Sequence, residues 1–237
     1  MSIAQFIDHT ILKPTTILGD IERVCNEAME YGFAAVCIPP YYVKDAVQIL
    51  SGSKPRVATV IGFPFGYHHY TSKEAEVLQA LRDGAHEVDV VMNIAAFKSN
   101  DMAYLESEID AITKITVEKN AIVKVIIESG VLNEEEIIKC CELYRHYPVH
   151  FLKTSTGYAD HGASIEAVHI MRQHLPATIQ IKASGGIRDF SFAKNLIHAG
   201  ATRLGCSAGV AIVKEERTDG DRKGRPSHSP EKDERGY

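Results

Sequence analysis

The stretch IQIKASGGIRDFSFAKNLIHAGATRLGC, residues 179–206, contains the pattern that decides the fold. It begins with a β-branched apolar run (Ile179–Ser184), continues through an amphipathic helical segment, and ends in a second apolar run (Thr202–Cys206). Gly200 stands where the helix should stop, just ahead of the second run. Two strands of the same orientation joined by a helix form a βαβ unit, so this stretch predicts a parallel sheet.

The same alternation of strand and helix runs through the preceding sequence. Helical patterns follow each of the first seven candidate strands, and some begin with capping signals, as at Thr71 with Glu74 and Asn133 with Glu136. Eight such units over residues 1–213 favour a single closed (βα)8 (TIM) barrel over an open doubly wound sheet. No GxGxxG opens the first crossover, which argues against dinucleotide binding. The candidate strands are Phe6–Ile11, Phe33–Ile38, Val57–Gly62, Glu87–Met92, Ile122–Glu128, Val149–Thr154, Ile179–Ser184 and Thr202–Cys206.

After Val213 the composition changes. Residues 214–237 (KEERTDGDRKGRPSHSPEKDERGY) mix charges of both signs with Gly, Pro and Ser, and they contain no aliphatic residue. Such a segment cannot bury a core, so we expect a short, flexible polar tail after the barrel domain. The terminal Tyr237 is the exception, because its ring and hydroxyl could dock elsewhere on the protein.

Composition narrows the classes of function. The 237 residues are 45% hydrophobic and 24% charged, as in ordinary globular proteins, and the net charge of -5 argues against general affinity for nucleic acid or anionic membranes. The chain shows neither a membrane-spanning run nor a signal peptide, so a cytoplasmic protein is expected. The five cysteines are odd in number and form no CxxC, which indicates reduced thiols, and His68 and His69 lack partners at metal-ligand spacing; no metal site is predicted.

Two lysines lie near the ends of apolar strands: Lys153 in FLKTSTG and Lys182 in IQIKASGG. A lysine on a buried strand is costly because its charge loses water, so such a residue is usually paired, bound to a metal or catalytic. Alternation along the strands places Lys182 inside the barrel, and it does the same for Asp89 in HEVDVVMN. We therefore expect one carboxylate and two ammonium groups to converge on one cavity.

This trio suits Schiff-base chemistry. Two ammonium groups roughly 5 Å apart at an effective dielectric of about 20 repel by about 3 kcal/mol, which corresponds to roughly two pKa units. A lysine made neutral in this way attacks an aldehyde, and a carboxylate paired with the second lysine can move the protons. The alternative is a structural ion pair between Asp89 and one lysine. Lys124 and Glu128, which share a face of the fifth strand, are expected to form a supporting ion pair.

Glycine-rich loops follow the last two strands. Ser184–Gly186 and Gly205–Gly209 stand where (βα)8 barrels commonly bind phosphate, and Arg188 could add a charge-assisted hydrogen bond. Gly157 and the hydroxyl groups before it form a third polar rim beside Lys153.

Together these segments resemble the deoxyribose-phosphate aldolases. The combination of EVDVV, KTSTG and KASGGIR in that order is highly specific, and the likeness extends from the amino terminus to about Val213. The segments that carry it are Ile7–Pro14 (IDHTILKP), Val60–Gly66 (VIGFPFG), Glu87–Ile94 (EVDVVMNI), Val123–Gly130 (VKVIIESG), Phe151–Gly157 (FLKTSTG), Ile181–Asp189 (IKASGGIRD) and Thr202–Gly209 (TRLGCSAG).

The resemblance implies a class I aldolase, free of metal and cofactor, which reversibly cleaves 2-deoxy-D-ribose 5-phosphate to D-glyceraldehyde 3-phosphate and acetaldehyde in deoxyribonucleotide catabolism. It implies that Lys153 is the Schiff-base lysine, that Asp89 and Lys182 relay protons, and that Asp8 helps to order the substrate hydroxyl groups. It also implies a homodimer. The phosphate-binding positions implied are Gly157, Gly185, Gly186, Arg188, Gly205 and Ser207.

Two departures and two rival functions remain at this point. Tyr158 follows KTSTG where some members have a phosphate-binding lysine, so phosphate affinity is expected to depend more on the glycine loops. His68-His69 give an unusual loop after the third strand. One rival is another phosphate-binding barrel enzyme, either an isomerase or a Schiff-base aldolase acting on a longer sugar phosphate. The other rival is a non-catalytic protein that binds sugar phosphates on the same fold.

Overall fold

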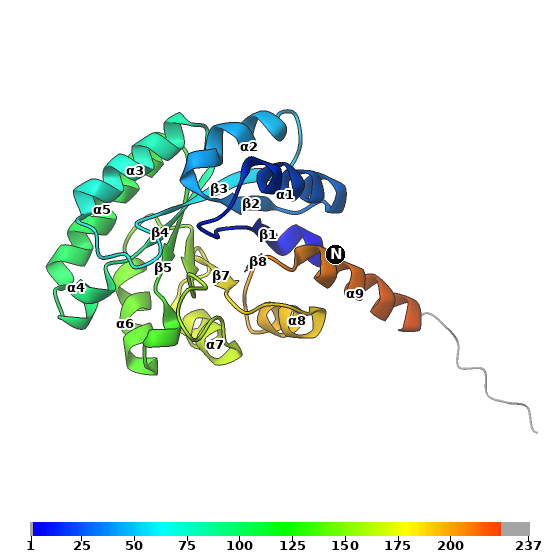
Figure 1. The fold of residues 1–237 in the computed structure, drawn as a ribbon. Coiled ribbons are helices and arrows are strands. Elements are labelled where there is room, and N and C mark those ends of the chain that lie inside the picture. Colours follow the sequence, from blue (N-terminus) through cyan, green and yellow to red (C-terminus); the bar gives the residue numbers. More distant parts are fainter. Residues whose placement is uncertain (1, 224–237) are drawn as a thin grey trace, which may run out of the picture.

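The computed structural model describes residues 2–223, and eight parallel strands within them form a closed barrel (Figure 1). They are β1 (Ile7–Thr10), β2 (Ala35–Ile38), β3 (Arg56–Ile61), β4 (Glu87–Val91), β5 (Ile122–Ile126), β6 (Phe151–Lys153), β7 (Gln180–Ser184) and β8 (Arg203–Cys206). Each strand pairs with its neighbours in sequence order, and β8 pairs with β1 to close the barrel. The predicted (βα)8 barrel and its eight strands are confirmed.

Helices cover the outside of the barrel (Figure 1). They are α1 (Leu18–Tyr31), α2 (Val43–Ile49), α3 (Tyr70–Arg82), α4 (Ile94–Lys98), α5 (Met102–Glu118), α6 (Glu134–Tyr144), α7 (Ile165–His174), α8 (Phe190–His198) and α9 (Gly209–Lys223), with short 3-10 helices at Ile3–Phe6, Pro40–Tyr42 and Ser129–Val131. Apolar strand residues such as Val88 and Ile181 are fully buried in the core beneath the helices. Between residues 2 and 223, no helix is both long enough and apolar enough to cross a membrane.

Local capping signals set where several helices begin. Asn133 accepts a hydrogen bond from the Glu136 backbone N–H, and the Glu136 side chain accepts one from the Asn133 N–H, so the predicted capping box of α6 is confirmed. The predicted cap at Thr71 was wrong, because the side chain of His69 caps α3 by accepting a hydrogen bond from the Thr71 N–H. A histidine ring nitrogen can replace the usual hydroxyl or carboxylate at a helix start, which the sequence pattern does not reveal.

The polar tail was predicted to begin at residue 214, but α9 continues to Lys223, so the predicted boundary is too early. Glu216 holds this helix to the amino terminus by accepting hydrogen bonds from Ser2 Oγ at 2.7 Å and the Ile3 N–H at 2.8 Å. Glu215 likewise accepts one from the Phe190 N–H at the start of α8. Two glutamates of this polar stretch thus accept hydrogen bonds from neighbouring segments of the barrel. Composition alone does not reveal such contacts, so it placed the end of the folded region too early. Residues 224–237, and with them Tyr237, lie outside the described residues.

A buried ion pair joins the helices on one side of the barrel. Lys73 of α3 donates to Glu108 of α5 at 2.5 Å and to the Val91 carbonyl at the end of β4 at 2.7 Å. Glu108 also accepts from the Asn93 N–H at 3.0 Å, and both side chains of the pair are almost completely shielded from solvent. The pair therefore anchors the segment that directly follows β4, at the carboxyl end of the barrel.

We expect Lys73→Met to destabilise the protein by about 3–5 kcal/mol, because it leaves the Glu108 carboxylate buried without its partner. Urea denaturation would measure the change. The matched control is Lys114→Met, which breaks the exposed Lys114–Asp110 pair of α5 and should cost less than about 1 kcal/mol. Equal losses of unfolding free energy in the two variants would show that the buried pair stabilises the protein no more than the exposed pair does.

Candidate active site

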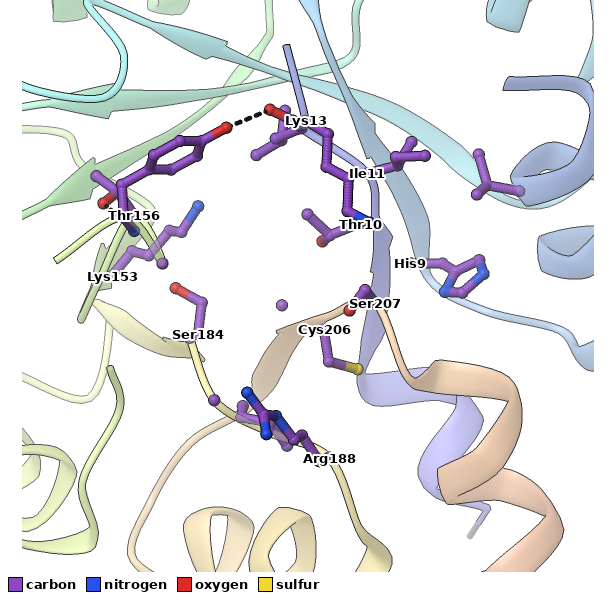
Figure 2. A pocket seen from close by; sticks show the side chains of 18 of the residues that line it. His9, Thr10, Ile11, Lys13, Lys153, Thr156, Ser184, Arg188, Cys206 and Ser207 are labelled. Atoms are coloured by element: carbon purple, nitrogen blue, oxygen red, sulfur yellow. Dashed lines mark hydrogen bonds between the residues drawn. The ribbon is translucent and has the colours of Figure 1, made fainter. Parts of the chain in front are cut away.

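A cavity of about 560 Å³ opens at the carboxyl ends of the strands, between the loops that follow β1, β6, β7 and β8 (Figure 2). This is the end of the barrel where the sequence predicts the active site. Lys153 and the glycine loops form part of its wall (Figure 2). The residues predicted to bind substrate that line it are Gly157, Gly185, Gly186, Arg188, Gly205 and Ser207.

Asp89, Lys153 and Lys182 meet inside the barrel, as predicted. One oxygen of Asp89, Oδ2, accepts hydrogen bonds from Lys153 Nζ at 2.8 Å and from Lys182 Nζ at 2.7 Å. Strand register brings the lysines together, because Lys153 of β6 pairs directly with Lys182 of β7. All three side chains are almost fully buried, and only Lys153 reaches the cavity wall. The carboxylate therefore links a reachable amine to one that is fully enclosed.

Asp8 lies inside the barrel, away from the cavity lining. It is completely buried, does not line the cavity, and binds Lys182 Nζ at 2.5 Å and Arg203 at 2.6 Å. The implied role of Asp8 in helping to order the substrate hydroxyl groups stays a prediction. The position of Asp8 on β1 beside β8 makes it a partner of Lys182 and Arg203.

The predicted Lys124–Glu128 ion pair is wrong. Lys124 binds Glu87 at 2.5 Å and Asp89 Oδ1 at 2.8 Å within the barrel. β5 ends at Ile126, so the strand alternation that would place Glu128 on the same face no longer applies there. Lys124 thus binds Oδ1 of Asp89, whereas Lys153 and Lys182 share Oδ2.

Glu128 instead holds the loop after β6. Its backbone is left-handed, with φ of 53°, which is uncommon for a residue other than glycine. The carboxylate accepts hydrogen bonds from the Thr156 N–H at 3.2 Å and from Thr156 Oγ1 at 2.5 Å. Burial raises the pKa of Glu128 above its ordinary value, against the opposing effect of these hydrogen bonds. The strained conformation directs this carboxylate to the loop that follows Lys153.

The pKa values of the two lysines shift in opposite directions. Burial lowers the pKa of Lys153 below its ordinary value; the Asp89 carboxylate opposes that effect, and the positive charge of Lys182 adds to it. Burial also acts to lower the pKa of Lys182, but the carboxylates of Asp8 and Asp89 outweigh it and raise that pKa. Lys153 is therefore the amine that is more readily neutral. From the sequence, the lowered pKa was expected to come from repulsion between the two lysines, but burial is the larger cause.

Three lysines hold Asp89 ionised. Burial acts to raise the pKa of its carboxyl, but the ammonium groups of Lys124, Lys153 and Lys182 outweigh that effect and keep the pKa well below its ordinary value. Asp89 is thus an ionised acceptor that lies within hydrogen-bond distance of both amines. This arrangement suits the movement of protons between Lys153 and Lys182.

The loops after β6 and β7 are linked to each other. Ser184 Oγ donates to the Ser155 carbonyl at 2.5 Å, and Thr154 Oγ1 donates to the Ser184 carbonyl at 3.2 Å. Gly205 must lack a side chain, because a Cβ there would lie 2.9 Å from Ser184 Cβ and 3.0 Å from Lys182 Cε. This glycine therefore makes room for Lys182 as well as forming the cavity wall.

Sequence reasoning missed three cavity residues, which come from the first strand, the loop after it and the first helix. His9, Lys13 and Arg23 all line the cavity, on the side formed by β1 and α1. The signal that could have found them is position: the loop after β1 lies at the same barrel end as the glycine loops. Among the described residues that line the cavity there is no Asp or Glu, so its charged side chains are cationic.

Known proteins resemble this chain over the whole barrel. Residues 2–215 match the model of the DeoC/LacD family aldolase. The deoxyribose-phosphate aldolase of Thermococcus gammatolerans is 48% identical over 219 residues, covering 92% of this chain and 97% of that protein. That of Thermoanaerobacter sp. (strain X514) is 46% identical over 216 residues, covering 91% and 97%.

Solved structures agree. The crystal structure of a putative deoxyribose-phosphate aldolase from Coccidioides immitis superposes with a TM-score of 0.87 at 42% identity, covering 91% of this chain and 85% of that one. The fold and the match together define a class I aldolase. The chain belongs to the deoxyribose-phosphate aldolases of the DeoC/LacD family, which makes the enzyme an aldehyde-lyase.

Proposed function

We propose that Lys153 forms the Schiff base through which this enzyme cleaves 2-deoxy-D-ribose 5-phosphate, and that Asp89 and Lys182 move the protons. The observation that carries the proposal is the single Asp89 oxygen that lies 2.8 Å from Lys153 Nζ and 2.7 Å from Lys182 Nζ, while Lys153 alone of the three lines the open cavity. A structural ion pair would not require one of the amines to face the cavity.

The first stage is attack of neutral Lys153 Nζ on the aldehyde carbon C1 of the open-chain sugar. Loss of water from the carbinolamine gives an iminium ion, which accepts the electron pair of the C2–C3 bond as that bond breaks. The C3 hydroxyl loses its proton and becomes the aldehyde of glyceraldehyde 3-phosphate. The two remaining carbons are left on Lys153 as an enamine, which gains a proton at C2; water then releases acetaldehyde.

Every stage of this cycle moves a proton, and the enclosed Asp89–Lys182 pair supplies an acceptor and a donor close to the reacting amine. Lys182 holds its proton firmly because Asp8 and Asp89 raise its pKa, while Asp89 stays ionised. We infer that Asp89 is the group that receives protons from the Lys153 side and that Lys182 is the donor that returns them.

The phosphate group favours the cation-lined mouth of the cavity. Lys13, Arg23 and Arg188 line it together with the backbone of the glycine loops after β7 and β8. Backbone N–H groups and cations converge on an anion in such loops. We propose that the phosphate binds there, which leaves the aldehyde end of the sugar directed toward Lys153.

Borohydride reduction in the presence of 2-deoxyribose 5-phosphate or acetaldehyde, followed by peptide mass mapping, would test the assignment of the nucleophile. We expect one adduct, on Lys153. An adduct on Lys182 would exchange the roles of the two lysines. A folded protein that binds phosphate and gives no adduct would contradict the Schiff-base mechanism.

A panel of sugar phosphates would separate the proposed substrate from longer ones, and turnover in that panel would separate an enzyme from a binding protein. The homodimer implied by the resemblance stays a prediction, which sedimentation equilibrium would test. The deoxyribose phosphate aldolase of Aeropyrum pernix has a tetrameric structure.

A further inference from the structure

Tyr158 ties two loops together across the mouth of the cavity. Its hydroxyl donates a hydrogen bond of 2.8 Å to the carbonyl of Leu12, in the loop after β1 (Figure 2). Its ring packs edge-on against Phe63, with the ring centroids 5.4 Å apart and the planes at 89°. The tyrosine therefore connects the loop after β6 with the loops after β1 and β3, although half of its surface is exposed.

Lys13 follows Leu12 directly, and its side chain extends into the cavity (Figure 2). Within residues 2–223 it forms no ion pair, and the same holds for Arg188, which enters from the loop after β7. Arg23, by contrast, is engaged with Asp20 and Glu27. The mouth thus presents two cations that have no carboxylate partner in the described structure, and they come from two different loops.

We propose that Lys13 is a phosphate ligand of this enzyme and that Tyr158 is the residue that positions it. The proposal rests on the proposed function and deepens it. Tyr158 lines the cavity but brings no positive charge to it. Its hydroxyl instead holds the neighbouring loop, which brings the ammonium group of Lys13 to the cavity from the other side.

The physical case for Lys13 is that of a phosphate monoester at neutral pH. The ester carries a charge of about -1.5 to -2, which one guanidinium group does not balance. Backbone N–H groups of the glycine loops supply hydrogen bonds but no full charge. A lysine on an untethered loop loses much side-chain and loop freedom when it binds, and the Tyr158–Leu12 hydrogen bond removes part of that cost beforehand.

The test compares Lys13→Met, Tyr158→Phe and the double variant, with Lys54→Met as the matched control. Met keeps the length of the lysine without its charge, and Phe keeps the ring contact with Phe63 without the hydroxyl. Lys54 is an exposed lysine in the turn before β3, outside the cavity. Two quantities are measured: cleavage of 2-deoxyribose 5-phosphate against unphosphorylated 2-deoxyribose, and calorimetric binding of inorganic phosphate.

For Lys13→Met we expect KM for the phosphorylated sugar to rise about tenfold with kcat nearly constant, as suits loss of one charge-assisted hydrogen bond. Preference for the phosphorylated sugar and affinity for inorganic phosphate should fall by a similar factor. Tyr158→Phe should have a smaller effect of the same kind. The double variant should match Lys13→Met alone, because the hydroxyl acts through Lys13.

Wild-type KM in Lys13→Met, or equal losses on the phosphorylated and unphosphorylated sugars, would overturn the assignment of Lys13. Additive losses in the double variant would overturn the positioning role of Tyr158. If the unmodified enzyme cleaved neither sugar, the proposed function would fail, yet phosphate binding by the same four variants would still decide the role of Lys13.

Discussion

Lys153→Ala is expected to reduce turnover of 2-deoxyribose 5-phosphate by at least about 10⁴-fold, because the reaction then has no amine on which to form the iminium ion. Borohydride should trap no adduct on the variant. The barrel should stay folded, since Asp89 keeps its contacts with Lys124 and Lys182. Steady-state kinetics, reductive trapping and circular dichroism would measure the three results.

Lys153→Arg is the control that separates nucleophile from charge. Arginine keeps a cation beside Asp89, but its guanidinium group is not deprotonated in proteins and cannot form a Schiff base. We expect this variant to be as inactive as the alanine variant. Recovery of substantial activity with arginine would show that Lys153 acts through its charge and not as the nucleophile.

Lys182→Leu is expected to slow the reaction steeply near neutral pH and to displace the pH–rate profile. Lys153 must be neutral to attack, so activity rises with pH through its pKa. The positive charge of Lys182 contributes to lowering that pKa, and its removal therefore raises the pKa and moves the rising limb to higher pH. A displacement of about one to two pH units is expected from the separation of the charges. Profiles of kcat/KM against pH would measure it.

The plateau of the same profile tests the second role of Lys182. Loss of the proton donor should lower the rate even where Lys153 is fully neutral. Lys182→Arg keeps the positive charge, so its rising limb should stay near the wild-type position while its plateau falls. A rising limb that does not move in Lys182→Leu would show that this lysine has no electrostatic effect on Lys153.

The fold could be predicted from the sequence because its signals are local and repeated. Short β-branched runs, helices between them and glycines at the helix ends recur throughout the barrel, and strand alternation alone placed Asp89 and Lys182 inside it. The same reasoning failed at Glu128, where β5 ends two residues earlier than the apolar run suggests. It also failed for the extent of α9, which continues past residue 214 to Lys223 and whose Glu216 is anchored by residues at the other end of the chain.

The site could be predicted in its central residues but not in its partners. The trio was found because each member is a charged residue in an apolar strand. The contacts of Asp8 with Lys182 and Arg203 depend on how β1 closes against β8, which no local pattern contains. Lys13 was missed for a similar reason, since only the folded barrel brings the loop after β1 beside the glycine loops.

The network around Asp89 also sets an overall charge for the barrel interior. Among the described interior residues that contact one another, four cations (Lys124, Lys153, Lys182 and Arg203) face three carboxylates (Asp8, Glu87 and Asp89). Neutrality of the group therefore requires one amine to give up its proton, and Lys153 is the one whose pKa is lowered. Formation of the proposed iminium ion on Lys153 would restore one positive charge at that same position. In the proposed mechanism, the charge of Lys153 would therefore depend on the whole interior group and not only on its nearest neighbours. Each catalytic cycle would thus involve charged residues that do not line the cavity.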